Sequence, residues 1–460
     1  IYAKGGINGG DGGQIETSGY RLITDGVSGS AAGPAGAAGD WLFDPNNVVI
    51  GSSGEPSEPF DGDNLISATV IAGLLEDGNN VTVTTFGNNT DLGNITVDSP
   101  ITKTSGNSDV TLLLKAANSI LINQPITHTG GSGELTLQFD ADNNSSSSDG
   151  SPSRDGGGIT LLEADLSTGG GDILFGGVAS AGYSGGDLFI GGGSNSIDVE
   201  TGGGNFEVKG QIIIANTSTN GVKVTTSGGD IDTGGGIDSG NSYSFVEGDS
   251  AGGDGWIQAE ANAQTRGGYL ATITSELENQ LASAATISGG DYRGAWIGVY
   301  RDKDDSVAGG DSYTWRYAAG SPEADQAFFQ QNSTRENTKP NGSAIDGRYN
   351  NFASGEPNGL GGGGEWAGQF FGSAALWNDL DGGQSYSPSM NDQYDVMGYV
   401  LETDLSESSL VLDAGAGGVT IGGGVGTSKA LASLDITALN TTVNGDGIVT
   451  TGKQEYSGGL

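Results

Sequence analysis

Five side chains with carboxylate or amide oxygens stand close together near the end of this sequence. They are Glu356, Asn358, Glu365, Asn378 and Asp379. Calcium prefers about six to eight hard oxygen ligands, and carboxylates and amides supply such oxygens. We therefore predict that these five residues hold a Ca2+ ion.

The predicted ligands fall in two loops that neighbouring residues should hold in place. Phe352 and Trp377 stand close to them in the sequence, and their large apolar rings suit a core position. Pro357 lies between two of the ligands and fixes a turn there. We expect both loops to belong to a folded domain.

The segment from 241 to 403 predicts a compact α+β domain. Five of the six tryptophans lie there. One helix is predicted before the Gly267-Gly268 pair, and a second after the Ser275-x-x-Glu278 capping box. The spacing that predicts the first helix places three apolar residues on one face: Trp256, Ala259 and Ala263.

The order of several motifs in this segment resembles the C-type lectin-like domain. The motifs are "GWIQAEANAQTRGGYLATITSELEN" (255–279), "AWIGVYRD" (295–302), "YTW" (313–315), "YNNFASGEPN" (349–358), "LWNDL" (376–380) and "GYVLE" (398–402). The landmarks "WIG", "GEPN" and "WND" are the most specific of them. The resemblance implies that the first and last strands pair, here 242–246 with 399–402.

The resemblance also implies a function for the predicted calcium ligands. In the family, a Glu-Pro-Asn tripeptide helps to hold a Ca2+ ion that accepts two adjacent hydroxyls of a sugar. It implies a cis bond before Pro357 and a preference for mannose-type sugars. By this resemblance the ligands of both the calcium and the carbohydrate are Glu356, Asn358, Glu365, Asn378 and Asp379.

Three features depart from the family pattern. The chain has no cysteine, so Leu401, and Gly382 or its neighbours, replace disulfide cysteines, and the fold must hold by packing. The loop 359–364 is rich in glycine where the family often has an acid, which argues against a second calcium ion. The stretch 318–348 is long and is a candidate to cover or extend the binding surface.

Outside this segment the sequence repeats with a period in the twenties. The segments 94–117 and 119–141 align, and weaker copies continue to 235 and return after 408. In the aligned pair, Ile95, Val97 and Ile101 recur as Ile120, Ile122 and Ile126.

Short apolar alternations separated by glycine turns predict the coils of a right-handed parallel β-helix, with strands stacked about 4.8 Å apart. A disordered glycine-rich linker is the alternative, and the register of the repeat argues against it. The chain is therefore predicted to be mostly β, with a β-helix stalk over 1–240, an inserted lectin-like domain over 241–403 and a β-helix continuation over 404–460.

The repeats, together with "WLFDPNNVVI" (41–50), resemble filamentous-haemagglutinin-type adhesins, which are long secreted β-helical proteins of bacteria. The resemblance implies a secreted or cell-surface location and an adhesin or surface-filament role. The chain begins at Ile1 without Met, and we expect it to be a fragment or processed form of a longer protein. Both ends read like the middle of an array, which predicts either further chain or end-to-end self-association.

The composition excludes several classes of partner. The 460 residues include 17 Lys+Arg and 57 Asp+Glu, which gives a formal net charge of −40. This charge repels phosphate backbones and anionic lipid surfaces, so no nucleic acid and no membrane insertion are expected. It attracts divalent cations.

The sequence does not predict an enzyme. The single histidine, His128, lies in a predicted β-helix turn, where we expect a solvated role, so no Ser-His-Asp triad can be built. The acidic "RDKDDS" (301–306) is interpreted as a solvated loop, with a second cation site as the alternative. The main rival to the carbohydrate-binding reading is a structural subunit of an extracellular fibre or sheath, in which the lectin-like domain contacts neighbouring subunits.

Overall fold

The structure is a computed structural model. It describes residues 1–19, 22, 24, 26–45, 48–52, 64–85, 93–141, 158–162, 164–176, 187–191, 195–215, 221–248, 255–288, 291–301, 314–332, 340–359, 365–371, 376–387, 394–404 and 408–459. The chain forms two compact units. The first comprises Ile1–Gly240 with Leu405–Leu460, and the second comprises Asn241–Asp404.

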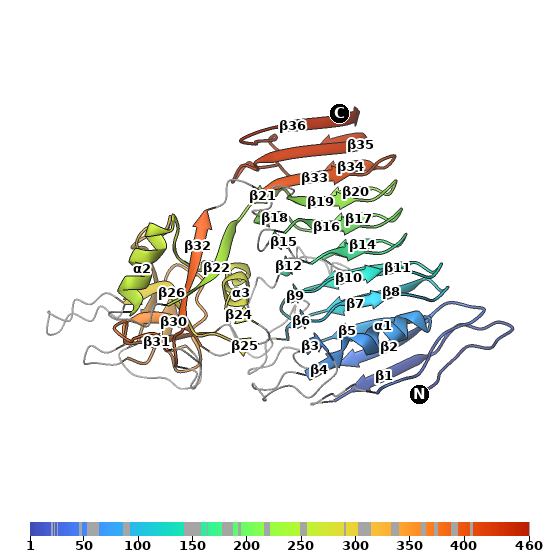
Figure 1. The fold of residues 1–460 in the computed structure, drawn as a ribbon, viewed down its shortest axis with the longest axis horizontal. Helices are drawn as coiled ribbons and strands as arrows, with labels where there is room; N and C mark the ends of the chain where they lie inside the picture. The colour runs from blue at the N-terminus through green and yellow to red at the C-terminus, as the bar shows by residue number, and fades with distance from the viewer. Residues whose placement is uncertain are drawn as a thin grey trace. The chain divides into compact units, whose positions relative to one another are not determined.

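The first unit is a parallel β-helix, so the predicted mostly-β fold class is confirmed. Its strands stack in three columns, with the first strand β1 and the last strand β36 at opposite ends (Figure 1). The first column contains β1 (Gln14–Ser18), β2 (Gly39–Asp44), β5 (Asn79–Thr84), β8 (Val110–Lys115), β11 (Leu135–Asp140), β14 (Ile173–Phe175), β17 (Phe206–Val208), β20 (Ile231–Thr233), β34 (Gly418–Ile421) and the second half of β35 (Ser433–Val443).

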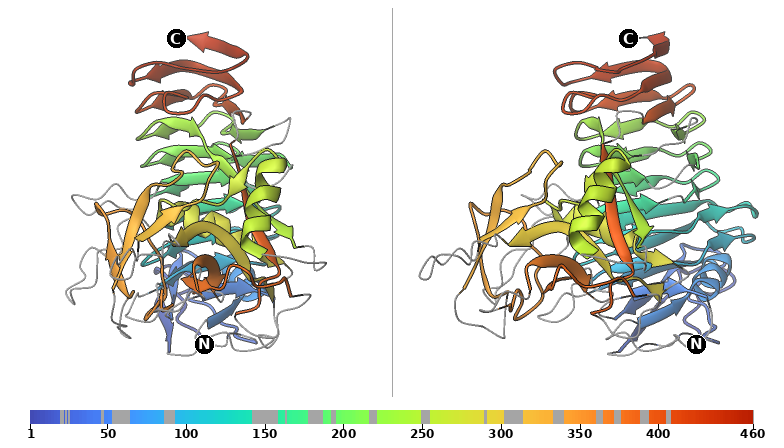
Figure 2. Two further views of the ribbon diagram at one scale, coloured as in Figure 1. Left: turned by 90° about the vertical axis from the view of Figure 1, so that its left-hand side faces the viewer. Right: turned by 60° about the vertical axis from the view of Figure 1, so that its left-hand side comes forward.

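Two further columns form the rest of the β-helix, whose stacked strands the turned views show (Figure 2). The second column contains β7 (Ile101–Lys103), β10 (Ile126–His128), β13 (Leu166–Ser167), β16 (Ile197–Glu200), β19 (Val222–Thr225), β33 (Ser409–Asp413), the first half of β35, and β36 (Gln454–Gly459). The third contains β4 (Asn64–Ser67), β3 (Val48–Gly51), β6 (Ile95–Val97), β9 (Ile120–Ile122), β12 (Ile159–Leu162), β15 (Leu188–Gly191), β18 (Ile212–Ala215) and β21 (Ile237–Ser239).

The register of the sequence repeat is confirmed by the strand pairing. Ile95 lies beside Ile120 in the third column, and Ile101 lies beside Ile126 in the second. All four side chains are fully buried. Because successive side chains of a strand point to opposite faces, a repeat that keeps its register stacks like on like inside the helix.

One helix in this unit was not predicted from the sequence. α1 (Ala68–Glu76) buries Ile71, Leu74 and Leu75, which follow the spacing of one helical face. Its last residue, Glu76, accepts hydrogen bonds from the backbone N and Oγ1 of Thr104, at 2.7 Å and 2.6 Å. These bonds lower the pKa of Glu76, the Thr104 hydroxyl contributing most. The helix thus packs against β7, the first strand of the second column.

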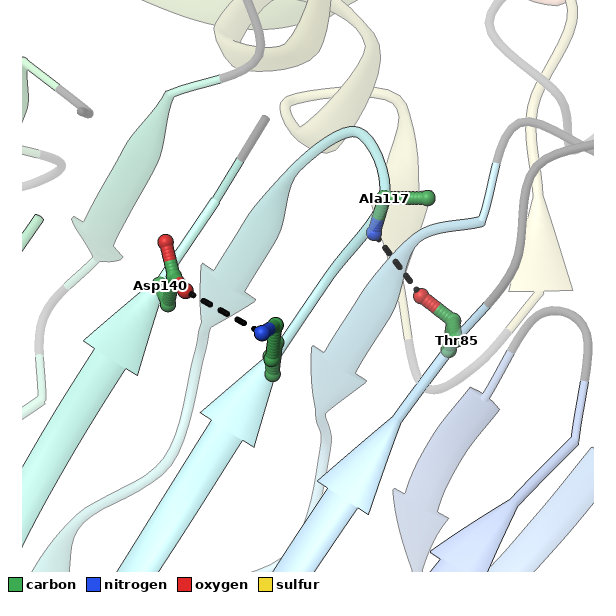
Figure 3. A network of polar contacts seen from close by, with 4 residues as sticks. Thr85, Ala117 and Asp140 are labelled. Carbon is green, nitrogen blue, oxygen red and sulfur yellow. Dashed lines mark hydrogen bonds and ion pairs between the residues drawn. The ribbon is translucent and has the colours of Figure 1, made fainter. Parts of the chain in front are cut away.

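Polar side chains join successive rungs where the strands end (Figure 3). The backbone N–H of Ala117 donates to Thr85 Oγ1 at 3.1 Å, and that hydroxyl donates to the carbonyl of Gly93 at 2.6 Å. One rung further, Lys115 and Asp140 form an ion pair with 3.9 Å between Nζ and Oδ2. Burial raises the pKa of Asp140, while Lys115 opposes this. The turns are therefore tied to their neighbours by side chains as well as by backbone.

Buried threonines close three consecutive turns of the second column. Thr168, Thr201 and Thr226 are fully buried, and each hydroxyl donates to the carbonyl three residues ahead at 2.5 Å. The Thr201 hydroxyl also lies 3.3 Å from the carbonyl of Thr226, on the next rung. Each hydroxyl thus satisfies a buried carbonyl within its turn, and those of Thr168 and Thr201 also lie within hydrogen-bond distance of a carbonyl on the next rung. A buried carbonyl without a partner would cost free energy.

We predict that Thr201→Val lowers the free energy of unfolding of the β-helix by about 1–3 kcal/mol, because it leaves the buried Gly204 carbonyl without this donor. Guanidinium unfolding followed by far-UV circular dichroism measures the change. Thr201→Ser keeps the hydroxyl and should lose much less. The half-buried Thr225 provides the matched Thr→Val control. Equal stability of Thr201→Val and Thr225→Val would refute this role.

In the described residues, the second unit is built on a mixed sheet with two helices. Its central order is β22 (Asn241–Glu247), β32 (Gly398–Asp404), β26 (Ala295–Arg301), β27 (Thr314–Tyr317), β28 (Ala327–Gln331) and β29 (Gly342–Ala344). β23 (Tyr269–Leu270), β30 (Ala367–Phe371) and β31 (Leu376–Leu380) join this sheet, and β24 (Ile287–Ser288) pairs with β25 (Asp291–Tyr292).

Three predictions about the second unit are confirmed. β22 and β32 pair antiparallel, with Ser242 beside Thr403 and Val246 beside Tyr399. α2 (Gly255–Thr265) buries its Trp256, Ala259 and Ala263 face. α3 (Glu276–Ala284) begins at the cap Ser275, whose Oγ accepts from the backbone N of Glu278 at 3.2 Å. Among the described residues, no helix is long and apolar enough to cross a membrane.

Candidate functional site

The hairpin of β30 and β31 positions two of the predicted ligands. Asn378 lies beside Gln369 and Asp379 beside Gly368 in the antiparallel register. Trp377, fully buried, precedes them and donates from Nε1 to Oδ1 of the buried Asn279 on α3 at 2.7 Å. The ring and its hydrogen bond therefore fix the start of the "WND" segment.

The loop that carries Glu356 and Asn358 is fastened to β31. The backbone N of Trp377 donates to the carbonyl of Asn351 at 2.8 Å, and the backbone N of Ala353 donates to the carbonyl of Trp377 at 2.9 Å. Phe352 packs edge-on against the Trp377 ring. Both aromatics were expected to anchor these loops, and each ring packs against the other.

The Glu356-Pro357 bond is cis, as the resemblance implied. Two buried amides hold the carbonyl of Pro357: Gln331 Nε2 and Asn341 Nδ2 each donate to it at 3.0 Å. The backbone N of Asn341 donates to the carbonyl of Glu356 at 2.7 Å. These two amides were missed from the sequence, which holds no local signal for a contact between distant segments.

Asp379 joins the two loops through its carboxylate. Its Oδ1 accepts from the backbone N of Asn358 at 2.8 Å, and its Oδ2 accepts from the backbone N of Gly359 at 2.9 Å. Glu356 lies close to Asp379, and its side chain acts to lower the pKa of Asp379. Asp379 is 1% exposed and Glu356 is 8% exposed, so two adjacent carboxyl groups are buried here.

Burial affects the ionisation of the Glu356 and Asp379 carboxyl groups. Loss of water raises the pKa of Asp379, while the N–H groups of Asn358 and Gly359 and the contact with Glu356 oppose the rise. Two buried carboxylates in contact repel each other unless a cation or a proton lies between them. The carboxylate oxygens of Glu356 and Asp379 suit a hard divalent cation as ligands.

Glu365 lies close to Gly359, as Asp379 does. A methyl group built on Gly359 would lie 2.7 Å from Cβ of Glu365 and 2.9 Å from Oδ2 of Asp379. Only glycine leaves room for so close an approach. The structure thus brings together Glu356, Asn358, Gly359, Glu365 and Asp379, with Asn378 next along β31.

The acidic groups do not by themselves form a complete metal cage. Within the described ranges, no group of three or more His, Cys, Asp or Glu side chains is arranged to hold a metal ion. A calcium ion bound by Glu356 and Asp379 would take further oxygens from the side-chain amides of Asn358 and Asn378. Amide oxygens are ordinary calcium ligands, so the residue types fit.

Three other features were singled out from the sequence: His128, the acidic stretch 301–306 and the glycine-rich loop 359–364. His128 was expected in a solvated turn, but it is half-buried and its Nε2 is buried without a hydrogen-bond partner. Burial, and then the neighbouring Lys103, lower its pKa, because both disfavour the charged imidazolium. Residues 302–306 of the "RDKDDS" stretch and residues 360–364 of the glycine-rich loop lie outside the described residues.

A further buried acid of this unit was not singled out from the sequence. Glu402 on β32 is 1% exposed and accepts from the backbone N of Thr272 at 2.9 Å, from Nδ2 of Asn241 at 2.5 Å and from the hydroxyl of Tyr269 at 3.2 Å. Burial, and then the negative charge of Glu278, raise its pKa to about 8, despite these donors.

The comparisons with known proteins give two similar solved structures. The cow C-type carbohydrate-recognition domain of CD23, determined with a GlcNAc2Man3 oligosaccharide, is 23% identical, covering 36% of this chain and 88% of that chain, with a TM-score of 0.22. The mouse scavenger receptor C-type lectin carbohydrate-recognition domain is 18% identical, covering 36% and 90%, with a TM-score of 0.22. No family model matches the chain, and no curated protein matches its sequence.

We predict that Glu402 makes the second unit less stable as pH rises. Its pKa of about 8 in the folded protein lies above the ordinary value of 4.5, so its contribution is complete below pH 4.5 and is lost as pH rises towards about 8. Glu402→Gln, which mimics the protonated acid, should flatten this decline. The measurement is thermal unfolding of the full chain from pH 5 to pH 9, followed by tryptophan fluorescence.

The exposed Glu247 on β22 provides the control. Glu247→Gln should leave the pH dependence of the melting temperature as it is in the unaltered chain. If Glu402→Gln also leaves it unchanged, Glu402 is ionised in the folded protein at neutral pH and the prediction is wrong.

Proposed function

We propose that the protein binds carbohydrate through a Ca2+ ion held by Glu356, Asn358, Glu365, Asn378 and Asp379, and that it works outside the cell as an adhesin or surface-filament component. The observation that carries the proposal is the buried contact of Glu356 with Asp379 in two loops that the Asp379 carboxylate joins. Burying two carboxyl groups together costs stability, and a bound divalent cation offsets that cost.

The same side chains suit the recognition of sugar hydroxyls. A bound Ca2+ ion supplies a Lewis-acidic centre that accepts hydroxyl oxygens. The carboxylate of Glu356 can only accept hydrogen bonds, whereas the amide of Asn358 can donate as well. An acid and an amide on either side of Pro357 therefore present unlike groups to two neighbouring hydroxyls, and we expect them to set the orientation of a mannose-type ring.

The surrounding contacts support a preformed site. The carbonyl of Pro357 is held by Gln331 and Asn341, and the backbone N of Asn358 is held by Asp379. A loop fixed in this way loses little conformational entropy when it binds, which favours affinity. Because the chain has no cysteine, these contacts replace covalent bridges as the means of holding the loop.

We predict that calcium raises the melting temperature of the unaltered chain and that Asp379→Asn removes most of this effect. The substitution removes a negative charge, and it sets an amide against two backbone donors, those of Asn358 and Gly359. We expect calcium affinity to fall more than ~10-fold. Calorimetric titration with calcium and thermal melting with millimolar calcium or chelator measure both changes.

Asp381→Asn is the matched control, because Asp381 is exposed and lies just beyond β31. It should bind calcium as the unaltered chain does. A melt that is identical with calcium and with chelator would leave the five residues as parts of a scaffold. A glycan array, run with calcium and with chelator, then tests the sugar: calcium-dependent signals on mannose-type glycans support the proposal, and their absence favours the structural rival.

A second role, end-to-end self-association, rests on the end rungs of the β-helix. Large apolar side chains are exposed at both ends: Ile1, Tyr2 and Ile7 near the first rung, and Leu439 and Val449 near the last. An open strand edge beside exposed apolar groups favours stacking of copies. We predict that the scattering mass of this chain rises with concentration. A single monomer mass at high concentration would argue against stacking.

A further inference from the structure

Arg301 connects the two chain segments that carry Asn358 and Glu365. It is the last residue of β26 and is 6% exposed. Its backbone N donates to the carbonyl of Trp366 at 2.8 Å, and its Nη1 donates to the carbonyl of Gly359 at 2.8 Å. One residue from a central strand therefore contacts both ends of the loop that separates these two ligands.

The two residues that Arg301 contacts each follow a predicted ligand in the chain. Gly359 follows Asn358, and its backbone N donates to Oδ2 of Asp379 at 2.9 Å. Trp366 follows Glu365, and its backbone N donates to the carbonyl of Leu380 at 2.9 Å. Gly359 is thus held at its carbonyl by the Arg301 guanidinium and at its N–H by the Asp379 carboxylate.

We propose that Arg301 is a positioning residue for the calcium site: its guanidinium fixes the Gly359 carbonyl and thereby orients Asn358 and Asp379 toward the ion. The inference rests on the proposed function, since it concerns the same ligands. Arg301 does not itself bind the ion, because a guanidinium has donors and no acceptor.

Two effects of Arg301 on calcium have opposite signs. Its positive charge repels a nearby cation, so removing the charge alone would tighten calcium binding. Its hydrogen bond prearranges the loop, so removing the bond would weaken calcium binding. The direction of the change therefore distinguishes positioning from electrostatics. Arg301→Met removes both the charge and the donors and keeps most of the buried volume, whereas Arg301→Lys keeps the charge and one donating group.

Calorimetric titration of the full chain with calcium alone is the first measurement. We expect Arg301→Met to raise the dissociation constant by ~10-fold or more and Arg301→Lys to recover part of the loss. Arg348→Met is the matched control: Arg348 also donates from Nη1 to a backbone carbonyl, that of Ala327 at 2.9 Å, but it contacts no predicted ligand. It should bind calcium as the unaltered chain does.

Hydrogen exchange in the presence of chelator is the second measurement, read by mass spectrometry on peptides covering 351–359. We expect faster exchange in Arg301→Met than in Arg348→Met, because the N–H groups of Asn358 and Gly359 lose their fixed arrangement. This measurement does not depend on calcium, and the tryptophan fluorescence of each variant verifies that it is folded.

The outcomes separate the two proposals. Equal or tighter calcium binding by Arg301→Met, when the unaltered chain binds calcium, overturns the positioning role and leaves the proposed function standing. No calcium binding by the unaltered chain overturns the proposed function. In that case the exchange measurement still decides whether Arg301 orders the loop: equal exchange in both variants would overturn this as well.

Discussion

The carboxylate of Asp379 is the interaction on which the candidate site depends. It accepts the backbone N–H groups of Asn358 and Gly359 and contacts Glu356, so one buried side chain of β31 defines the path of a loop twenty residues away. A buried acid with two fixed donors is a costly arrangement for a fold alone. The same arrangement provides what a divalent cation requires, namely hard oxygen atoms that are already buried away from water.

The second unit holds its loops without disulfides, because the chain has no cysteine. Buried tryptophan rings whose indole N–H groups are hydrogen-bonded hold the loops instead. Trp377 donates to Asn279, and Trp315 donates to Gln331, whose amide holds the Pro357 carbonyl. Each ring buries a large apolar area and also fixes one polar contact, so packing and loop position are coupled. A substitution that disturbs this core is therefore expected to displace the predicted calcium ligands.

The β-helix follows a different rule, since its rungs repeat. Aliphatic residues stack inside it, and buried threonines at Thr168, Thr201 and Thr226 satisfy turn carbonyls rung after rung. Exposed acids contribute as well: Asp230 accepts from the backbone N of Gly418 on the next rung at 2.7 Å. Some of the acidic side chains therefore form hydrogen bonds between rungs, while the net charge of −40 repels other polyanions.

The sequence by itself determined the repeat register, the α2 face and the Ser275 cap, because each depends on a local pattern that one strand or helix imposes. The β22–β32 pairing was predicted only through the resemblance in motif order. The sequence also singled out the five oxygen-bearing residues, through a resemblance. Only the tertiary structure decided that Glu356 touches Asp379, that Arg301 and Gln331 hold the loop, and that Glu402 is buried. Such contacts join segments far apart in the chain, where burial and approach distance, rather than spacing along the sequence, set the chemistry.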